Sequence, residues 1–180
     1  MLSLRHLRAS RLWHGIGVLA AAATTTVALL GVSAGPANAA AGFTVRLAPM
    51  TNPILNVEVR GNSLYPGATV DQWVVNGGWN QVWKFQPRDN YFQIVNKLSG
   101  LCLTTDGVAG HTLYQDNCTG ARTQLWNTNL TPGDLIGYPI QSVASGLFVD
   151  VRGGSDRIGA DIITWHFNGG YNQYFLGTSA

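Results

Sequence analysis

Hydrophobic and polar residues alternate along several short stretches of this chain, the pattern of strands that bury one face. Turn-forming pairs such as Pro66-Gly67 and Asp106-Gly107 separate these stretches. No longer segment has a helical period, so the pattern predicts an all-β protein. The clearest alternating stretches are residues 43–47, 92–95, 148–151 and 161–165.

A Gln-x-aromatic motif occurs three times, and its Gln residues are Gln81, Gln124 and Gln173. The intervals of 43 and 49 residues indicate an internally repeated fold. A unit of this size cannot bury its own apolar face, so the copies are expected to share one core. The repeats are placed at about 43–88, 89–133 and 134–180. The aromatics expected in the core are Trp83, Trp126 and Phe175.

The first 39 residues have the features of a secretory signal peptide. Arg5, Arg8 and Arg11 precede an apolar run at 16–30, and the small residues 37–39 suit a cleavage site. The alternative is a membrane anchor, but the run is short for a span and is interrupted by three Thr. We therefore expect a secreted, extracellular domain of residues 40–180 that does not insert into a membrane.

Removing this leader changes the net charge of the chain. Three of the eleven basic residues lie in the leader, so eight remain against nine acidic residues, a formal charge of −1. A near-neutral chain without a basic cluster is a poor candidate for binding nucleic acid. An uncharged partner is the better expectation.

Two cysteines, Cys102 and Cys118, lie within the second repeat. A single pair in an oxidising compartment is expected to form a disulfide. The matching positions are Asn56 and Val75 in the first repeat and Phe148 and Phe167 in the third. The aromatic pair suggests that these positions face each other, with apolar packing in place of the bridge.

These motifs resemble those of the ricin B-type lectins and family-13 carbohydrate-binding modules, whose repeats end in Gln-x-Trp. The resemblance covers nearly all of residues 40–180. It implies a β-trefoil of about 12 strands with up to three shallow sugar sites, one in each lobe. It also implies a site made of an acid on the second strand, an aromatic on the third, an Asn just beyond it and the closing Gln.

The first and third repeats carry this set with identical spacing. The acid precedes the Gln by 23 residues and the Asn precedes it by five. The second repeat keeps its Gln without the acid, the aromatic or the Asn, which indicates a degenerate site. The third repeat supplies Asp150, Trp165, Asn168 and Gln173, the first supplies Glu58, Trp73, Asn76 and Gln81, and the second has Thr104, Asp116, Thr119 and Gln124.

Such a set suits a neutral sugar. A Trp ring offers a platform for the C–H face of a pyranose, while carboxylate and amide groups bind its hydroxyls. Asp150 and Asn168 are expected to orient the sugar, with Gln173 and Gln81 supporting the site from behind. The longer Glu58 moves its carboxylate by about 1.5 Å, so the third site ranks above the first.

Other classes of function find less support in the sequence. Glu58 and Asp150 fall in different repeats and cannot share one glycosidic bond, and His111 and His166 are isolated, so we expect no enzyme, no metal and no cofactor. The remaining alternative is a protein-binding trefoil, such as a protease inhibitor or toxin-associated adhesin, that uses the loop 152–157 or the run around Tyr65. The lectin would act alone or beside a separate secreted enzyme or toxin component.

Overall fold

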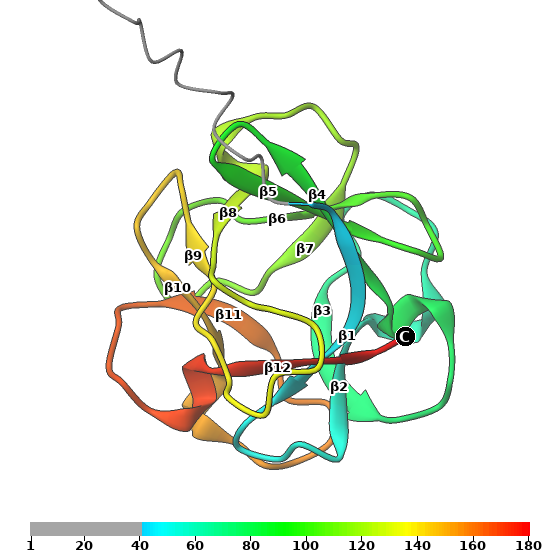
Figure 1. The fold of residues 1–180 in the computed structure, drawn as a ribbon, viewed down its shortest axis with the longest axis vertical. Coiled ribbons are helices and arrows are strands. Elements are labelled where there is room, and N and C mark those ends of the chain that lie inside the picture. The colour runs from blue at the N-terminus through cyan, green and yellow to red at the C-terminus, as the bar shows by residue number, and fades with distance from the viewer. Residues whose placement is uncertain (1–40) are drawn as a thin grey trace, which may run out of the picture. The chain divides into compact units, whose positions relative to one another are not determined.

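Twelve short strands form the part of the chain that the computed structural model describes, residues 41–180 (Figure 1). The predicted signal peptide lies outside the described residues. The all-β prediction is confirmed. The strands are β1 (Phe43–Pro49), β2 (Leu55–Val59), β3 (Val70–Val74), β4 (Trp83–Arg88), β5 (Tyr91–Asn96), β6 (Cys102–Thr104), β7 (Tyr114–Asp116), β8 (Leu125–Asn127), β9 (Gln141–Ser142), β10 (Phe148–Val151), β11 (Ile162–Trp165) and β12 (Phe175–Ser179).

Six of these strands close into a barrel. β12 pairs with β1, β1 with β4, β4 with β5, β5 with β8 and β8 with β9, all antiparallel. Reciprocal backbone hydrogen bonds of 3.0 Å between Tyr138 and Phe175 join the segment before β9 to β12 and complete the circuit. In Figure 1, β1 and β12 cross near the centre of the described domain. Each repeat thus contributes its first and last strands to the barrel.

The other six strands form three hairpins, β2–β3, β6–β7 and β10–β11. Backbone hydrogen bonds link each hairpin to the next: Gln72 N–H to Ala160 O, Leu113 N–H to Ile162 O, and Gln115 N–H to Ala68 O. The hairpins therefore cap the barrel as a ring of three. A closed barrel with a triangular cap is a β-trefoil, as the resemblance implied.

Each repeat also contains a short 3₁₀ turn that ends on the Gln of its Gln-x-aromatic motif. These turns are η2 (Trp79–Gln81), η3 (Arg122–Gln124) and η5 (Tyr171–Gln173). The aromatic residue two positions later then starts or lies in the closing strand. Two further turns, η1 (Arg60–Asn62) and η4 (Arg152–Gly154), follow β2 and β10.

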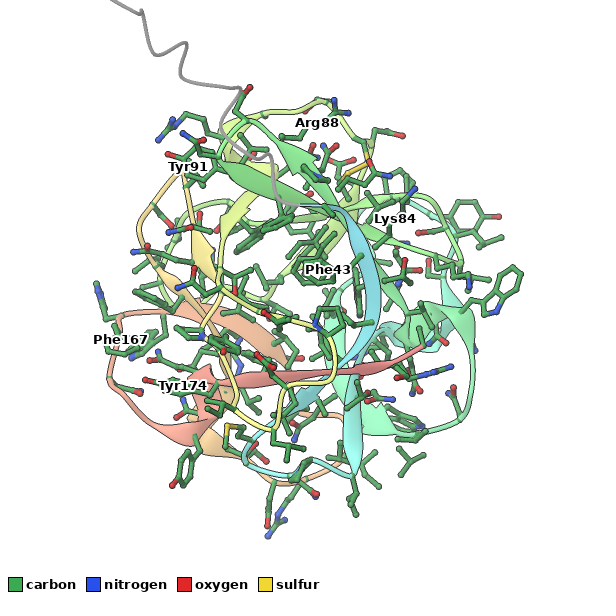
Figure 2. All side chains as sticks on the ribbon, in the orientation of Figure 1. Phe43, Lys84, Arg88, Tyr91, Phe167 and Tyr174 are labelled. Carbon is green, nitrogen blue, oxygen red and sulfur yellow. A yellow bond between two sulfur atoms is a disulfide. The ribbon has the colours of Figure 1, made fainter. Side chains whose placement is uncertain are left out.

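The closing aromatics meet in one core, as predicted. Trp83, Trp126 and Phe175 are all completely buried among apolar residues from all three repeats. The Trp83 and Trp126 indoles each donate a hydrogen bond to a carbonyl of the second strand in their own repeat, at 2.9 and 3.1 Å. Phe175 has no such donor, so the third lobe relies on packing alone there. Figure 2 shows Phe43 near the middle of the domain, where its ring stacks on Phe85.

The predicted disulfide between Cys102 and Cys118 is present, with a Cα–Cα distance of 5.1 Å. It ties β6 to the loop after β7, and closing a loop of this length stabilises the fold by about 3 kcal/mol. In the third lobe, Phe148 and Phe167 face each other with ring centroids 4.8 Å apart. Aromatic packing therefore takes the place of the bridge there, as expected.

Among residues 41–180, no helix is long and apolar enough to cross a membrane.

Candidate functional site

The third lobe carries a hollow of about 490 Å³ beside the β10–β11 hairpin. Asp150, Trp165 and Asn168, three of the residues predicted from the sequence, line this hollow. The fourth, Gln173, is completely buried and binds Asp150 from behind. The other lining residues are Gly110, Arg152, Gly153, Gly154, Ile163 and Asn172.

Asp150 is a buried carboxylate with one oxygen left for a ligand. Its Oδ2 accepts hydrogen bonds from Asn172 Nδ2 at 2.6 Å and from Gln173 Nε2 at 2.9 Å. Its Oδ1 accepts none from the described residues. Burial raises the pKa of Asp150, and the bonds from Asn172 and Gln173 offset part of that rise. The carboxylate is thus fixed in orientation while one acceptor faces the hollow.

Trp165 ends β11 and is 40% exposed, in contrast to the buried Trp of the closing motifs. Its indole lies against Gly110, which belongs to the second lobe. The Cζ3 and Cε3 atoms of the ring therefore lie close to a neighbouring lobe, while part of the ring borders the hollow. This arrangement suits a stacking platform.

Asn168 has a structural role in addition to its place in the hollow. Its Oδ1 accepts the backbone N–H of Gly170 at 2.7 Å, and its own N–H donates to Gln173 Oε1 at 2.8 Å. These bonds hold the turn between β11 and η5. The Nδ2 group has no partner among the described residues and remains free to donate to a ligand.

The first lobe contains an equivalent hollow of about 510 Å³. Glu58, Trp73 and Asn76 line it, and Trp73 is 40% exposed like Trp165. Gln81 Nε2 donates to Glu58 Oε2 at 2.8 Å, and Glu58 Oε1 accepts no hydrogen bond from residues 41–180. The longer acid thus presents one bound and one free oxygen, as Asp150 does.

The three Gln side chains make the same contacts in every lobe. Each donates from Nε2 to a backbone carbonyl seven residues earlier and accepts at Oε1 from the backbone N–H five residues earlier. Each also donates to the second-strand residue, which is Glu58, Thr104 or Asp150. Because the second lobe has these bonds without the acid, they belong to the scaffold. This agrees with a supporting role for Gln81 and Gln173.

In the second lobe, pairing between strands places Asp116 opposite Cys102, where the other lobes have Trp73 and Trp165. Thr104 stands where the other lobes have an acid, and its hydroxyl accepts from Gln124. Thr119 occupies the position of the Asn and donates to Gln124 Oε1. The positions of the set are therefore preserved in this lobe, while the residues that could hold a sugar are not.

Sequence reasoning missed Asn172, Arg152 and Gly110, all of which line the third hollow. A signal for Asn172 was available, because an Asn precedes the Gln in both the first and third repeats. In the third lobe Asn172 donates directly to Asp150, whereas in the first the Asn80 amide donates to the Val59 carbonyl and lowers the pKa of the nearby Glu58.

Two arginines at matching positions connect the two hollows through one carboxylate. Arg60 lines the first and Arg152 the third, each two residues after the acid. Arg60 binds Asp161 Oδ1 at 2.8 Å and Arg152 binds Asp161 Oδ2 at 3.2 Å. Both guanidinium groups are about half exposed, so these pairs add modestly to stability.

Among the described residues, no group of three or more His, Cys, Asp or Glu side chains is placed to hold a metal ion.

Gly110 shapes the Trp165 platform and provides a test of it. Gly110 and Gly67 share a left-handed conformation, with φ of +86° and +84°. An added Cβ would lie 3.1 Å from Trp165 Cζ3 at Gly110 and would meet nothing within 4 Å at Gly67. Gly110→Ala and Gly67→Ala should therefore share a backbone cost of about 1–2 kcal/mol in thermal unfolding. Only Gly110→Ala should weaken third-lobe binding, and equal affinities for the two variants would contradict this role.

Comparison with known proteins places the chain in a family. The family described as "Ricin-type beta-trefoil lectin domain-like" matches residues 37–110 and 79–165. The chain therefore belongs to the ricin-type β-trefoil lectin-like family, as its motifs indicated. Comparison with curated protein sequences gave no match.

Solved structures with the same fold come from several contexts. ThreeFoil, a designed threefold-symmetric protein, is 26% identical with a TM-score of 0.68 and matches 76% of this chain and 99% of its own. An exo-β-1,3-galactanase from Clostridium thermocellum is 28% identical with a TM-score of 0.70; the match covers 81% of this chain but only 31% of the galactanase. The C-half of an earthworm R-type lectin, in complex with GalNAc, is 19% identical with a TM-score of 0.57, covering 74% of this chain and 95% of that one. The last similarity shows the fold alone.

Proposed function

We propose that this chain is a secreted carbohydrate-binding protein that recognises sugars of polysaccharides or glycans without catalysis. The third lobe is its principal site and the first lobe a second one. The observation that carries this proposal is the recurrence of one arrangement in two hollows: a half-exposed Trp, an oriented buried acid with a free oxygen, and an Asn at the rim. The second lobe has the same scaffold and lacks all three.

The chemistry of the third hollow fits a pyranose ring. The Trp165 indole would contact the C–H face, while Asp150 Oδ1 would accept from ring hydroxyls through charge-assisted bonds. Asn168 Nδ2 would donate to a further hydroxyl. Because Gln173 and Asn172 already orient Asp150, little ordering would accompany binding.

Binding without hydrolysis is supported by the surroundings of the acids. The third hollow has one acid, Asp150, among its lining residues, and Asp71 in the first is held by Arg60 with its Oδ1 buried, so neither hollow offers two open carboxylates to one glycosidic bond. The match covers only 31% of the galactanase, so there the fold is one part of a longer chain. A role beside a separate secreted enzyme or toxin component is therefore compatible with this domain. Two sites on one domain would increase avidity for a repetitive polysaccharide.

The loops that suggested a protein-binding trefoil have a structural role. Gln72 Nε2 donates to the carbonyls of Ser155 and Arg157, and Gln115 Nε2 donates to those of Ser63 and Tyr65. The two loops are thus equivalent parts of the cap, each held by a neighbouring lobe. This favours the carbohydrate proposal over an inhibitor that presents a specialised loop.

A glycan-array and polysaccharide screen of residues 40–180 tests the proposal. The chain should bind at least one sugar class, and the double variant Trp73→Ala/Trp165→Ala should lose that binding while its circular dichroism spectrum is unchanged. Asp116→Ala, at the matching position of the second lobe, serves as the control and should bind normally. A folded protein that binds no glycan would contradict the proposal.

A further inference from the structure

The first-lobe hollow contains two carboxylates that face each other across a hairpin. Glu58 on β2 and Asp71 on β3 are directly paired, and side chains in such positions have Cβ atoms about 4.5–5.5 Å apart on the same face. Both residues line the hollow and both are buried, with 5% and 2% of their surface exposed. The equivalent pairs are Thr104 with Tyr114 in the second lobe and Asp150 with Ile163 in the third.

Like charges directly opposite each other in a sheet are destabilising, and burial strengthens their repulsion. Burial is the main cause that raises the pKa of Glu58; the side-chain amides of Gln81 and Asn80 lower it, and the charge of Asp71 raises it. Burial also raises the pKa of Asp71, despite the opposing effect of Arg60. Ionising both acids therefore has an electrostatic cost, which a cation bound beside the pair would reduce.

The described residues compensate this charge only in part. Arg60 Nε binds Asp71 Oδ2 at 2.8 Å, and Gln81 binds Glu58 Oε2. Asp71 Oδ1 is buried without a hydrogen-bond partner among residues 41–180, and Glu58 Oε1 accepts no bond from them. Arg60 thus pairs with Asp71 but not with Glu58, and it is also shared with Asp161.

The third hollow has a different charge balance. Its lining has one acid, Asp150, and one base, Arg152, with the apolar Ile163 where the first lobe has Asp71. The first hollow thus has one more negative charge than the third on an otherwise matched frame. Because the frames match, this extra charge is the main chemical difference between the two sites.

Building on the proposed function, we propose that the first-lobe hollow selects a sugar that carries a protonated amino group. The ring would lie on Trp73 and the ammonium would donate to Glu58 Oε1, with Asp71 acting through its charge because its Oδ1 lies below the surface. An ammonium supplies the second cation that the carboxylate pair lacks. N-acetylation removes this charge, so the acetylated form of the same sugar is disfavoured.

The test compares glucosamine and galactosamine with their N-acetyl forms, as monosaccharides and short oligomers. It is run at about pH 6.5, above the usual range of carboxyl pKa values and below that of an amine. Each sugar is titrated into a Trp165→Ala chain, in which only the first hollow keeps its Trp. At least one free amine should bind about tenfold more tightly than its acetylated form. Asp71→Asn keeps an acceptor for Arg60 and should reduce this preference to about twofold or less.

The reciprocal variant, Ile163→Asp in a Trp73→Ala chain, should shift the third hollow towards the amine. Equal affinity for free and acetylated amines in the Trp165→Ala chain would overturn the inference, as would a preference that survives Asp71→Asn. If the unaltered chain binds neutral glycans while the first hollow has equal affinity for free and acetylated amines, the proposed function stands and only this inference fails. If the folded chain binds no sugar of either kind, both fail.

Discussion

Trp165→Ala should lower the affinity of the third lobe for its sugar by about 30-fold, equivalent to about 2 kcal/mol, the range typical of a central aromatic contact. The indole is the largest apolar surface in the third hollow, and it is held against Gly110 before any ligand arrives. Its loss removes the platform while the Asp150 and Asn168 acceptors and donors remain. Binding is measured by isothermal titration calorimetry in a Trp73→Ala chain, so that the first hollow does not contribute.

The fold should survive this change, because Trp165 is 40% exposed and lies outside the core formed by Trp83, Trp126 and Phe175. The thermal midpoint therefore serves as the internal control. Asp116→Ala is the matched variant, since Asp116 occupies the position of Trp165 in the lobe without a site. Unchanged sugar affinity after Trp165→Ala in a folded protein would contradict the role of Trp165 as a stacking platform.

Gln124→Ala should lower the free energy of unfolding by about 3 kcal/mol and leave sugar affinity unchanged. The substitution strips partners from the Thr119 N–H, the Asn117 carbonyl and the Thr104 hydroxyl. A buried polar group left without a partner, here the Thr104 hydroxyl, costs about 1–3 kcal/mol, and the part-buried Thr119 and Asn117 groups add less each. Because the second lobe lacks the acid, the platform and the Asn, the loss should be purely structural.

Gln173→Ala is the matched variant in the lobe with the full set. It should destabilise by about 4 kcal/mol, because it also removes one of the two hydrogen bonds to the buried Asp150 carboxylate. It should weaken sugar binding as well, since Asp150 would lose part of its orientation. Urea unfolding and calorimetry separate the two effects. Sugar binding that depends equally on Gln124 and Gln173 would contradict the division between scaffold and site.

The sequence predicted the fold well because its period and its closing motifs are local and repeated. Three Gln-x-aromatic motifs, one Cys pair and short alternating stretches are enough to specify a shared core. The burial of Trp83, Trp126 and Phe175 and the facing of Phe148 and Phe167 follow from the same period. Residues that contact one another within a repeat were therefore accessible to prediction.

Contacts between repeats were not accessible in the same way. Gly110 and Trp165 lie in different lobes, and so do Arg60 and Asp161, so no spacing within one repeat indicates that they meet. The register of strand pairing within a hairpin could not be predicted from the sequence either. The pairing of Glu58 with Asp71 depends on the exact turn between β2 and β3, which the alternating pattern does not fix.

The burial of the acids was also missed by sequence reasoning. Asp150 was expected to orient a sugar with no prediction of its exposure, and it is 2% exposed and held by Asn172 as well as Gln173. Its assignment to sugar binding remains a prediction, now with a defined geometry in which only Oδ1 is free. Because burial raises the pKa of Asp150, this carboxylate should lose its charge at a higher pH than an exposed Asp does.

The most direct test of the central claim, that the third-lobe hollow is a sugar site, is a two-dimensional NMR titration of residues 40–180 with the best ligand from the screen. We expect the Trp165 indole N–H and the side-chain amides of Asn168 and Asn172 to shift together and to saturate with one dissociation constant. The buried indoles of Trp83 and Trp126 should not shift. Saturable shifts confined to other surfaces, with the Trp165 indole unmoved, would contradict the account.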